Sequence, residues 1–363
     1  MAGLKVMLDP TRVGREAERL EVDLHQRIIG QDAAIRQITG IYQTFTAGMS
    51  CPGRPIGSLL FLGPTGSGKT RTVEAVAESL VGDPRAVIKI DCAEFQHSHE
   101  IAKLIGSPPG YLGHRETHPL LSQEVLNAHH TADVKVSFVL FDEIEKASDA
   151  LWNLLLGILD KATLTLGDNR RVDFSRALIF MTSNLGAAEM GAILQPKLGF
   201  TSHETEREPL DDKKADRVSR AGVDAARRKF TPEFLNRIDR TVVFNSLAAA
   251  DLRQIVDLEL RGVQERVFRA TGTNTIEFTV TEQVKDLILQ EGTDQRYGAR
   301  HLKRAVERVL VQPLSNLIAT GQVQSGDHVT VELDPGRSRA IFLKEFSEPT
   351  PQVGTGSERS AAA

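Results

Sequence analysis

The sequence predicts an α/β protein with a mainly parallel sheet, followed by a smaller α+β domain. Short apolar runs, typical of buried parallel strands, occur at residues 58–62, 86–90, 136–141 and 177–183. Between them, residues 70–80 and 149–162 carry apolar side chains at the three- and four-residue spacing of a helix. This alternation of strand and helix indicates a parallel sheet with helices covering both faces.

Other segments complete this first domain. Residues 9–48 predict two helices around the turn "IIGQD", with Asp32 capping the second helix. Residues 163–175 predict an inserted hairpin that turns at Gly167, Asp168 and Asn169. Residues 201–222 are rich in charge, which is typical of a solvated loop or a frayed helix start.

The carboxy-terminal part predicts the second domain. It contains a long helix at 248–270, a strand at 275–280, helices at 281–290 and 299–319, and strands at 328–333 and 340–345. We therefore expect amino-terminal helices and a linker at 1–55, a large domain at 56–245, and a small domain at 246–345. The tail at 346–363 has too little apolar content to order itself, so we expect it to be disordered.

Composition excludes several classes of protein. The 363 residues contain no apolar run long enough for a membrane helix, and the charged start does not resemble a signal peptide, so we expect a cytoplasmic protein without membrane contact. The net charge of -4 argues against a protein that coats nucleic acid. Cys51 and Cys92 lie far apart and are expected to be reduced thiols. The histidines near residue 100 match no standard metal spacing: His97, His99, His114 and His118.

The stretch "GPTGSGKT" follows a predicted strand and opens a predicted helix, as a phosphate-binding loop requires. Its backbone N–H groups and the helix N-terminus would surround the phosphates of ATP. Lys69 is expected to reach the terminal phosphates, and Thr70 to bind Mg²⁺. The predicted ATP-binding residues of this loop are Gly63, Pro64, Thr65, Gly66, Ser67, Gly68, Lys69 and Thr70.

Two acidic residues end the apolar strand "VLFDE". Asp142 is placed to hold the magnesium ion, directly or through water. Glu143 is placed to orient and deprotonate a water molecule that attacks the terminal phosphate. The pair therefore predicts an ATPase; ordinary surface charge is the alternative, which the preceding run of apolar residues disfavours.

The loop at 63–70 and four later motifs, "VLFDEIEKA", "MTSN", "FTPEFLNRID" and "RYGARHLKR", occur in the order found in the Clp-type AAA+ ATPases. The sequence from about residue 24 to about residue 333 resembles the second ATPase module of ClpA, ClpB and ClpC. The resemblance implies a P-loop AAA+ core followed by a small Clp-type domain.

The resemblance also implies roles for single residues. Asn184 matches the sensor-1 residue that positions the attacking water, and Arg237 matches the arginine finger that enters the site of a neighbouring subunit. Arg300 matches sensor 2, which is directed at the phosphates. Ile28 and Ile29 match an apolar pair that packs on adenine, although core residues would look the same. A finger acting between subunits implies a ring, which is a hexamer in this family.

The stretch "IGSPPGYLGH" resembles the central-pore loop of Clp unfoldases, in which an aromatic residue grips a threaded polypeptide. The matching residues are Tyr111, Leu112, Gly113 and His114. A tyrosine that anchors an irregular loop by burial is the competing interpretation. His114 stands where the family has a second aromatic residue, and "RETHPLL" replaces an acidic glycine-rich continuation, so we expect a more basic pore.

A polar loop contains Leu198, Gly199 and Phe200, where ClpA and ClpC carry an apolar tripeptide that docks on the peptidase ClpP. A local hydrophobic staple explains these residues equally well. With one ATPase module, the chain is expected to be either a single-ring protein or a fragment of a larger ATPase.

The leading functional hypothesis is an ATP-dependent protein unfoldase or remodelling chaperone, a ring that threads protein substrates through its pore. One alternative is the unfoldase subunit of a Clp-type protease. Another is an AAA+ motor directed at DNA or transcription, to which Arg115, Arg170 and Arg171 would contribute, although we do not expect nucleic acid as the substrate. A nucleotide-gated scaffold without hydrolysis is disfavoured because Glu143 and Arg237 are both present.

Overall fold

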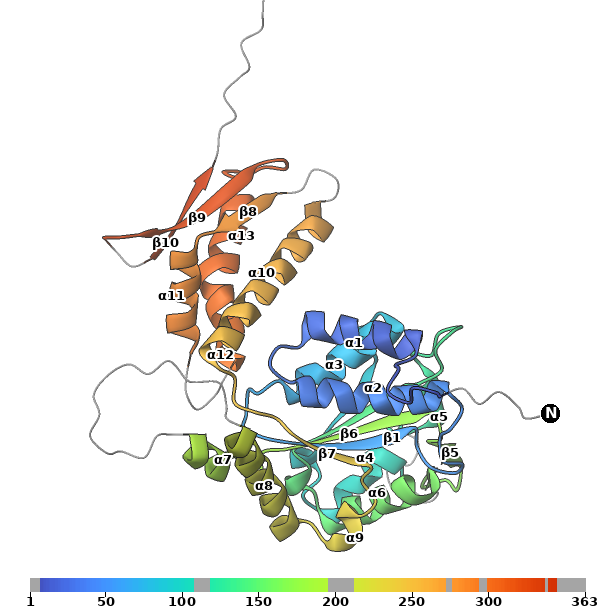
Figure 1. Ribbon diagram of the computed structural model, residues 1–363. Coiled ribbons are helices and arrows are strands. Elements are labelled where there is room, and N and C mark those ends of the chain that lie inside the picture. Colours follow the sequence, from blue (N-terminus) through green and yellow to red (C-terminus); the bar gives the residue numbers. More distant parts are fainter. Residues whose placement is uncertain are drawn as a thin grey trace, which may run out of the picture. The chain divides into compact units, whose positions relative to one another are not determined.

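The computed structural model describes residues 7–107, 118–194, 212–271, 276–293, 299–336 and 339–344 (Figure 1). The chain divides into two compact units: residues 1–255 with 293–301, and residues 256–292 with 302–363. The division falls inside one long helix, α10 (Ala249–Thr271). The expected domain limit near residue 245 therefore stays a prediction.

The first unit is built on a five-stranded sheet in the order β2-β3-β6-β1-β7. Every neighbouring pair in it is parallel, so the predicted α/β fold with a parallel sheet is confirmed. The strands are β1 (Gly57–Leu62), β2 (Val87–Asp91), β3 (Ser137–Asp142), β6 (Ala177–Ser183) and β7 (Arg240–Val243).

Helices cover both faces of this sheet (Figure 1). Successive strand residues point to opposite faces, so Leu59 and Phe61 of β1 enter one core while Leu60 and Leu62 enter the other. The first core is completed by α1 (Arg15–Arg27), α2 (Asp32–Thr46) and α3 (Lys69–Val81). The second core receives α6 (Asp149–Lys161) and the end of α8 (Asp212–Lys229).

Shorter elements connect these layers. They are α4 (Ala102–Ile105), α5 (Gln123–Asn127), α7 (Ala187–Leu194), α9 (Pro232–Leu235) and the hairpin of β4 (Thr163–Thr165) with β5 (Arg171–Asp173). The predicted hairpin is confirmed, and Asn169 in its turn has a φ of 67°, a value that asparagine tolerates better than most residues.

Residues 212–222 form the start of α8, which agrees with the helix start that was one of the two interpretations of residues 201–222. The helix buries a narrow stripe that includes Val218, Ala225 and Ala226, and residues 201–211 lie outside the described residues. One local prediction was wrong. Asp32 does not cap α2: it is the first residue of that helix, and Gln31 holds the capping position without a side-chain cap.

The second unit is an α+β fold, as predicted. Its three-stranded sheet has the order β10-β9-β8, with β8 (Glu277–Val280) parallel and β10 (Arg339–Lys344) antiparallel to β9 (His328–Asp334). Its helices after α10 are α11 (Glu282–Gly292), α12 (Arg300–Val306) and α13 (Gln312–Ala319). A π-helical turn at Glu307–Val311 interrupts the single helix expected at 299–319, since Pro313 cannot donate the next backbone hydrogen bond.

Among the described residues, no helix is both long and apolar enough to cross a membrane. Cys51 is exposed and Cys92 is buried, and both are free thiols. The tail expected at 346–363 lies outside the described residues.

Candidate nucleotide-binding site

The order of the sheet brings the predicted site residues to one edge. Strand β6 lies between β3 and β1, and all three run in the same direction. Segments that leave the carboxyl ends of parallel strands emerge at the same edge of the sheet. The acidic pair after β3, Asn184 after β6 and the glycine-rich loop after β1 therefore meet.

The glycine-rich loop has backbone angles that residues other than glycine rarely adopt. Gly66 and Gly68 have φ angles of 77° and 98°, and that of Gly63 is 150°. A Cβ atom on Gly63 would lie 2.6 Å from the carbonyl oxygen of Phe244. The loop ends where α3 begins at Lys69, so the unpaired N–H groups of a helix N-terminus adjoin it.

Lys69 is folded into this loop and is only 8% exposed. Its ammonium donates to the carbonyl oxygens of Gly63 at 2.7 Å and Pro64 at 2.9 Å, and to Asn184 Oδ1 at 2.9 Å. The charge is thus held by three oxygen acceptors beside the phosphate cradle.

Burial lowers the pKa of Lys69 from 10.5 to about 8. The negative charges of Asp142, Glu145 and Glu143 oppose that shift, and the positive charge of Arg300 adds to it. An ammonium group whose charge is disfavoured by burial gains from an added anion, as a phosphate would provide.

Thr182, a residue to which no sequence motif assigned a role, fixes the acidic pair Asp142 and Glu143. The Thr182 hydroxyl donates to Asp142 Oδ1 and accepts the backbone N–H of Glu143 at 3.1 Å. Glu143 has a φ of 55°, a strained value for a non-glycine residue that is typical of functional turns. Thr182 lies two residues before Asn184 on β6, within the quoted motif "MTSN", which was the available signal.

Asn184 joins Lys69 to Glu143. While its side-chain oxygen accepts from Lys69, its Nδ2 donates to Glu143 Oε1 at 3.1 Å, and its backbone N–H donates to Glu145 Oε1 at 3.1 Å. Lys146 Nζ lies 2.5 Å from the other oxygen of Glu143. The carboxylate proposed as the base thus has a hydrogen-bond donor on each oxygen.

The predicted magnesium ligands suit that ion. Asp142 offers a carboxylate whose Oδ2 is not used by Thr182, and Thr70 offers a hydroxyl from the first turn of α3. Mg²⁺ prefers such oxygen donors and is commonly held by one or two protein groups together with substrate phosphates. The donor set therefore fits Mg²⁺, although no cluster of three His, Cys, Asp or Glu ligands occurs in the described part of the chain.

Arg237 lies at the opposite edge of the sheet. It precedes β7, and its carbonyl oxygen accepts from the Ser58 hydroxyl at 3.4 Å, at the amino end of β1. Its guanidinium pairs with Asp160 at 2.6 Å and Glu233 at 2.9 Å. The five residues of β1 from Ser58 to Leu62 separate Arg237 from the glycine-rich loop, and an extended strand of that length spans about 16 Å.

The segment containing Arg300 contacts the glycine-rich loop. The backbone N–H of Ala299 donates to the carbonyl oxygen of Gly66 at 3.2 Å. The charge of Arg300 contributes to the lowered pKa of Lys69. The structure thus places the predicted sensor-2 segment beside the phosphate-binding loop.

Ile28 is buried in the core formed with α2 and α3, and Ile29 is half-buried. The pore-loop residues Tyr111, Leu112, Gly113 and His114, and the docking residues Leu198, Gly199 and Phe200, lie outside the described residues.

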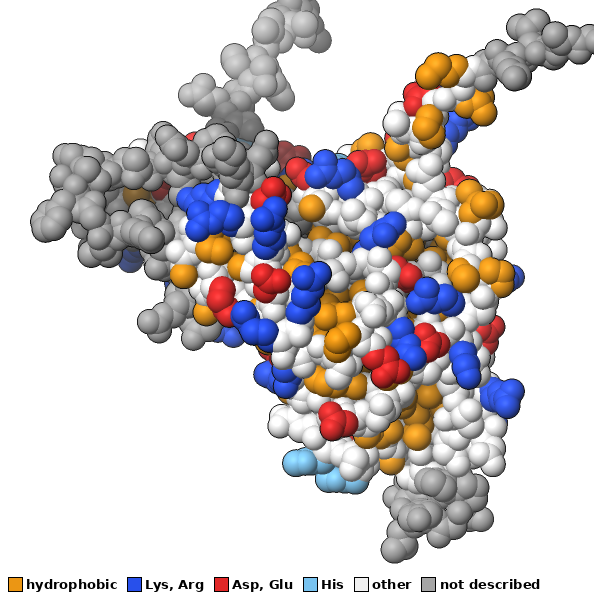
Figure 2. All heavy atoms as spheres, turned by 60° about the horizontal axis from the view of Figure 1, so that its bottom comes forward, with side chains coloured by type: hydrophobic (Ala, Val, Ile, Leu, Met, Phe, Trp, Pro, Cys, Tyr) orange, Lys and Arg blue, Asp and Glu red, His pale blue; other side chains and the backbone are white. Residues whose placement is uncertain are grey.

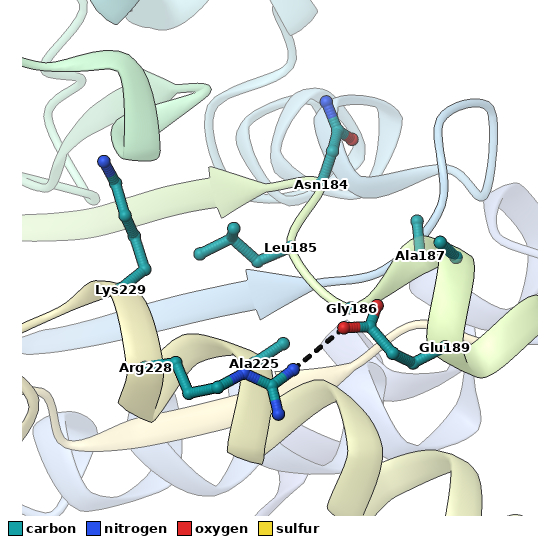
Figure 3. Close-up of a pocket in the computed structure, with 9 residues that line it drawn as sticks. Asn184, Leu185, Gly186, Ala187, Glu189, Ala225, Arg228 and Lys229 are labelled. Carbon is teal, nitrogen blue, oxygen red and sulfur yellow. Dashed lines mark hydrogen bonds and ion pairs between the residues drawn. The ribbon is translucent and has the colours of Figure 1, made fainter.

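A cavity of about 370 Å³ lies next to Asn184, between α7 and α8. Arg228 Nη2 and Glu189 Oε1 pair across it at 2.8 Å, and the Asn184 amide points away from that pair (Figure 3). The described residues that line this cavity belong to 184–189 and to α8, and none belongs to the glycine-rich loop. The cavity is therefore distinct from the phosphate cradle.

Fold and site together define a P-loop nucleotide-binding protein of the AAA+ class, with a small α+β unit after the core. The chain belongs to the family described as AAA domain (Cdc48 subfamily), which matches residues 54–241. Residues 247–331 match the C-terminal, D2-small domain of ClpB protein. The resemblance to Clp-type AAA+ ATPases that the motifs indicated is confirmed.

Sequence similarity to known Clp ATPases supports this assignment. The chain is 38% identical over 339 residues to the ATP-dependent Clp protease ATP-binding subunit ClpC of Staphylococcus aureus (strain USA300), which covers 93% of this chain and 39% of ClpC. It is 36% identical over 331 residues to the ClpA homolog of Cyanidium caldarium, covering 90% and 37%. The chain therefore spans about two fifths of the length of these relatives.

Among solved structures, a closed-state cryo-EM reconstruction of Hsp104 with ATPγS and FITC-casein is similar, with a TM-score of 0.72 and 29% identity. The match covers 91% of this chain and 52% of that chain.

Proposed function

We propose that the chain hydrolyses ATP and uses the energy to unfold or remodel proteins, as a ring that threads polypeptide through a central pore. The observation that carries the hydrolytic part is the position of Asn184, which contacts both Lys69 and Glu143 beside the glycine-rich loop. One polar side chain thereby links the group expected to bind the phosphates to the group expected to activate water.

Each residue has a chemical role in this proposal. The backbone of residues 63–68 cradles the phosphates, and Lys69 turns from the loop carbonyls towards them. Glu143 accepts the proton of the attacking water, and Asn184 keeps that water oriented. Mg²⁺, held by Thr70 and Asp142, would neutralise charge on the phosphates. Ile28 and Ile29 remain proposed adenine contacts, and Arg300 a proposed phosphate contact.

Arg237 supports a ring. Because β1 lies between it and the glycine-rich loop of its own subunit, Arg237 suits the site of a neighbouring copy better than its own. Its pairing with Asp160 and Glu233 keeps the guanidinium compensated until a phosphate competes for it. We propose a homo-oligomer, and specifically the hexamer expected from the family.

Protein as the substrate is supported by the match to the D2-small domain of ClpB and by a structural neighbour studied with casein. Tyr111 is the proposed gripping residue, since an aromatic ring gives contact area that does not depend on the substrate sequence. The cytoplasmic location expected from the sequence stays a prediction.

The test is threading of a tagged fluorescent protein by the Tyr111→Ala and Tyr111→Phe variants. Tyr111→Ala should lose unfolding while ATP turnover survives, and Tyr111→Phe should keep both because the ring remains. Full unfolding activity in Tyr111→Ala would contradict the pore assignment.

A partnership with a peptidase is the second candidate, because the similar staphylococcal protein is the ATP-binding subunit of a Clp protease. We propose Leu198, Gly199 and Phe200 as its docking segment. Phe200→Ala should abolish binding to a ClpP-type peptidase without changing ATP turnover; unchanged binding would exclude this segment.

A DNA-directed motor has less support. Basic and acidic side chains are interspersed on the face shown in Figure 2, where a DNA-binding stripe would be uniformly basic. Arg170 pairs with Asp168 at 2.7 Å and with Glu124 at 3.4 Å. ATP turnover should rise with casein and not with DNA, and the reverse result would favour the motor.

A further inference from the structure

Gln31 is a buried amide that connects three parts of the first unit distant in sequence. It is 4% exposed and lies between α1 and α2, in the turn "IIGQD". Its Nε2 donates to the carbonyl oxygens of Ser67 at 3.1 Å and Asn245 at 3.0 Å. Its Oε1 accepts the backbone N–H of Asn245 at 3.3 Å.

This arrangement uses both N–H donors and the carbonyl of the amide. The Asn245 N–H needs an acceptor, which sets the orientation of the side chain and turns both donors towards carbonyl oxygens. Glutamine is not a favoured capping residue and caps nothing here, although it holds the capping position of α2. Its long amide instead spans the gap between the glycine-rich loop and the segment after β7.

That segment also contacts the start of the glycine-rich loop and the turn before Gln31. The Phe244 carbonyl oxygen lies so near Gly63 that an added Cβ would be 2.6 Å from it. Gly30 lies against Asp251, whose carboxylate would be 3.1 Å from an added Cβ. Asp251 Oδ2 also accepts the N–H of Ala248 at 2.8 Å, one residue before α10. Residues 244–251 therefore contact the start of the phosphate cradle at Gly63 and the turn at Gly30, and Gln31 links this segment to the later part of the cradle at Ser67.

We propose that Gln31 is a positioning residue that ties the glycine-rich loop to residues 244–251, so that nucleotide binding and the order of that segment depend on each other. The proposal rests on the nucleotide site proposed above. It gives the turn "IIGQD" a role beyond adenine contact: a phosphate that orders the loop at Ser67 also holds the segment leading into α10.

Two substitutions separate this role from simple packing. Gln31→Glu has the same shape but turns an oxygen towards two carbonyl oxygens about 3 Å away, a repulsive contact. Gln31→Met conserves volume and removes every hydrogen bond. Gln43→Leu is the control, because Gln43 is a glutamine of α2 whose described side-chain hydrogen bond, to the Arg12 carbonyl oxygen at 3.4 Å, is exposed.

The first measurement is titration of the full chain with a fluorescent ADP analogue and Mg²⁺, well below each variant's melting temperature. Gln31→Glu and Gln31→Met should weaken binding about 10- to 100-fold, and Gln43→Leu less than about twofold. The KM for ATP should rise in parallel while kcat changes less. Wild-type affinity in folded Gln31→Met would overturn the proposal, since a purely structural glutamine lowers the melting temperature without changing that affinity.

The second measurement follows the segment after β7 in the unaltered chain and in one variant. Hydrogen exchange of the peptide covering 244–252 in the unaltered chain should slow when ADP and Mg²⁺ bind, and Gln31→Met should lose that response. Nucleotide that binds without slowing exchange there would also overturn the proposal. If the proposed ATPase function itself were wrong, the results would differ from these. The unaltered chain would bind no nucleotide, or the Glu143→Gln variant would keep full turnover.

Discussion

Asn184 Oδ1 accepts a 2.9 Å hydrogen bond from Lys69 Nζ, although the two residues lie 115 positions apart in the chain. The contact exists because β6 and β1 are neighbours in the sheet and end at the same edge. The same asparagine donates to Glu143. In the proposed mechanism, a phosphate that attracts Lys69 would free Asn184 for the attacking water and so couple substrate binding to Glu143.

Replacing Asn184 with alanine should lower the kcat for ATP by about 10²- to 10³-fold, because a preorganised polar contact to the attacking water is lost. Nucleotide affinity should stay close to wild type or tighten slightly, since Lys69 loses one competing acceptor. Steady-state kinetics with parallel nucleotide titration measure both. Asn153→Ala, an exposed asparagine of α6, is the control and should match wild type. A mainly KM effect in Asn184→Ala would contradict the assigned role.

Nucleotide binding should take up protons near pH 8.5. The folded-state pKa of Lys69, about 8, lies below its ordinary value of 10.5, so between these pH values the unfolded chain holds a proton that the folded chain has lost. The free energy of unfolding therefore rises with pH across that window. Phosphates favour the ammonium form and reverse the shift, so binding should weaken as pH rises above 8.

Calorimetry in buffers of different ionisation enthalpy would report this uptake directly. The Lys69→Met variant should show weaker binding and no contribution from this proton. Equal apparent binding enthalpies in all buffers at pH 8.5, for the wild type, would refute the prediction.

Arg237→Ala and Glu143→Gln should each be inactive alone and partly active when mixed. In a mixed ring, some sites combine an intact Glu143 with an intact Arg237 from the neighbouring subunit. Arginine fingers contribute roughly 10³- to 10⁵-fold to the rate, so the recovered turnover should be clear above background. ATP turnover against mixing ratio measures it. A finger that acted within its own subunit would give no recovery at any ratio.

Gly63→Ala should destabilise the fold by about 2 kcal/mol or more, because the added Cβ meets the Phe244 carbonyl at 2.6 Å in a strained backbone region. Gly157→Ala is the matched control: nothing lies within 4 Å of its Cβ position in α6. It should stabilise by about 0.5–1 kcal/mol through helix propensity. Denaturant unfolding measures the free energy of unfolding, which should fall in Gly63→Ala and rise in Gly157→Ala. Equal changes in the two variants would show that the close approach of Gly63 to Phe244 is unimportant.

Local pattern predicted most of the fold, because buried parallel strands and amphipathic helices leave strong periodic signals. The parallel sheet around "SLLFL" and the hairpin at 163–175 needed nothing else. The start of α8 was left between two interpretations, a loop or a helix start, because charged residues dominate that segment. Nor did the π turn before Pro313, which depends on hydrogen-bond register rather than on hydrophobic spacing.

The sequence predicted the site as separate motifs, but it did not predict the hydrogen bonds that connect them. Gln31, Thr182 and Lys146 act through contacts that only the tertiary fold or a local turn creates. Gln31 is 214 residues from Asn245, so no window of sequence contains both. No local signal marked it, because the neighbouring Asp32 was the residue expected to cap α2.

The proposed ATPase mechanism depends most on Glu143 acting as the base for ATP hydrolysis. ATP turnover of the wild type and of Glu143→Gln, at saturating ATP and Mg²⁺ and with nucleotide affinity measured in parallel, tests this directly. Glu143→Gln should bind nucleotide as well as the wild type and lose turnover by about 10²-fold or more. Turnover in Glu143→Gln equal to that of the wild type would contradict it.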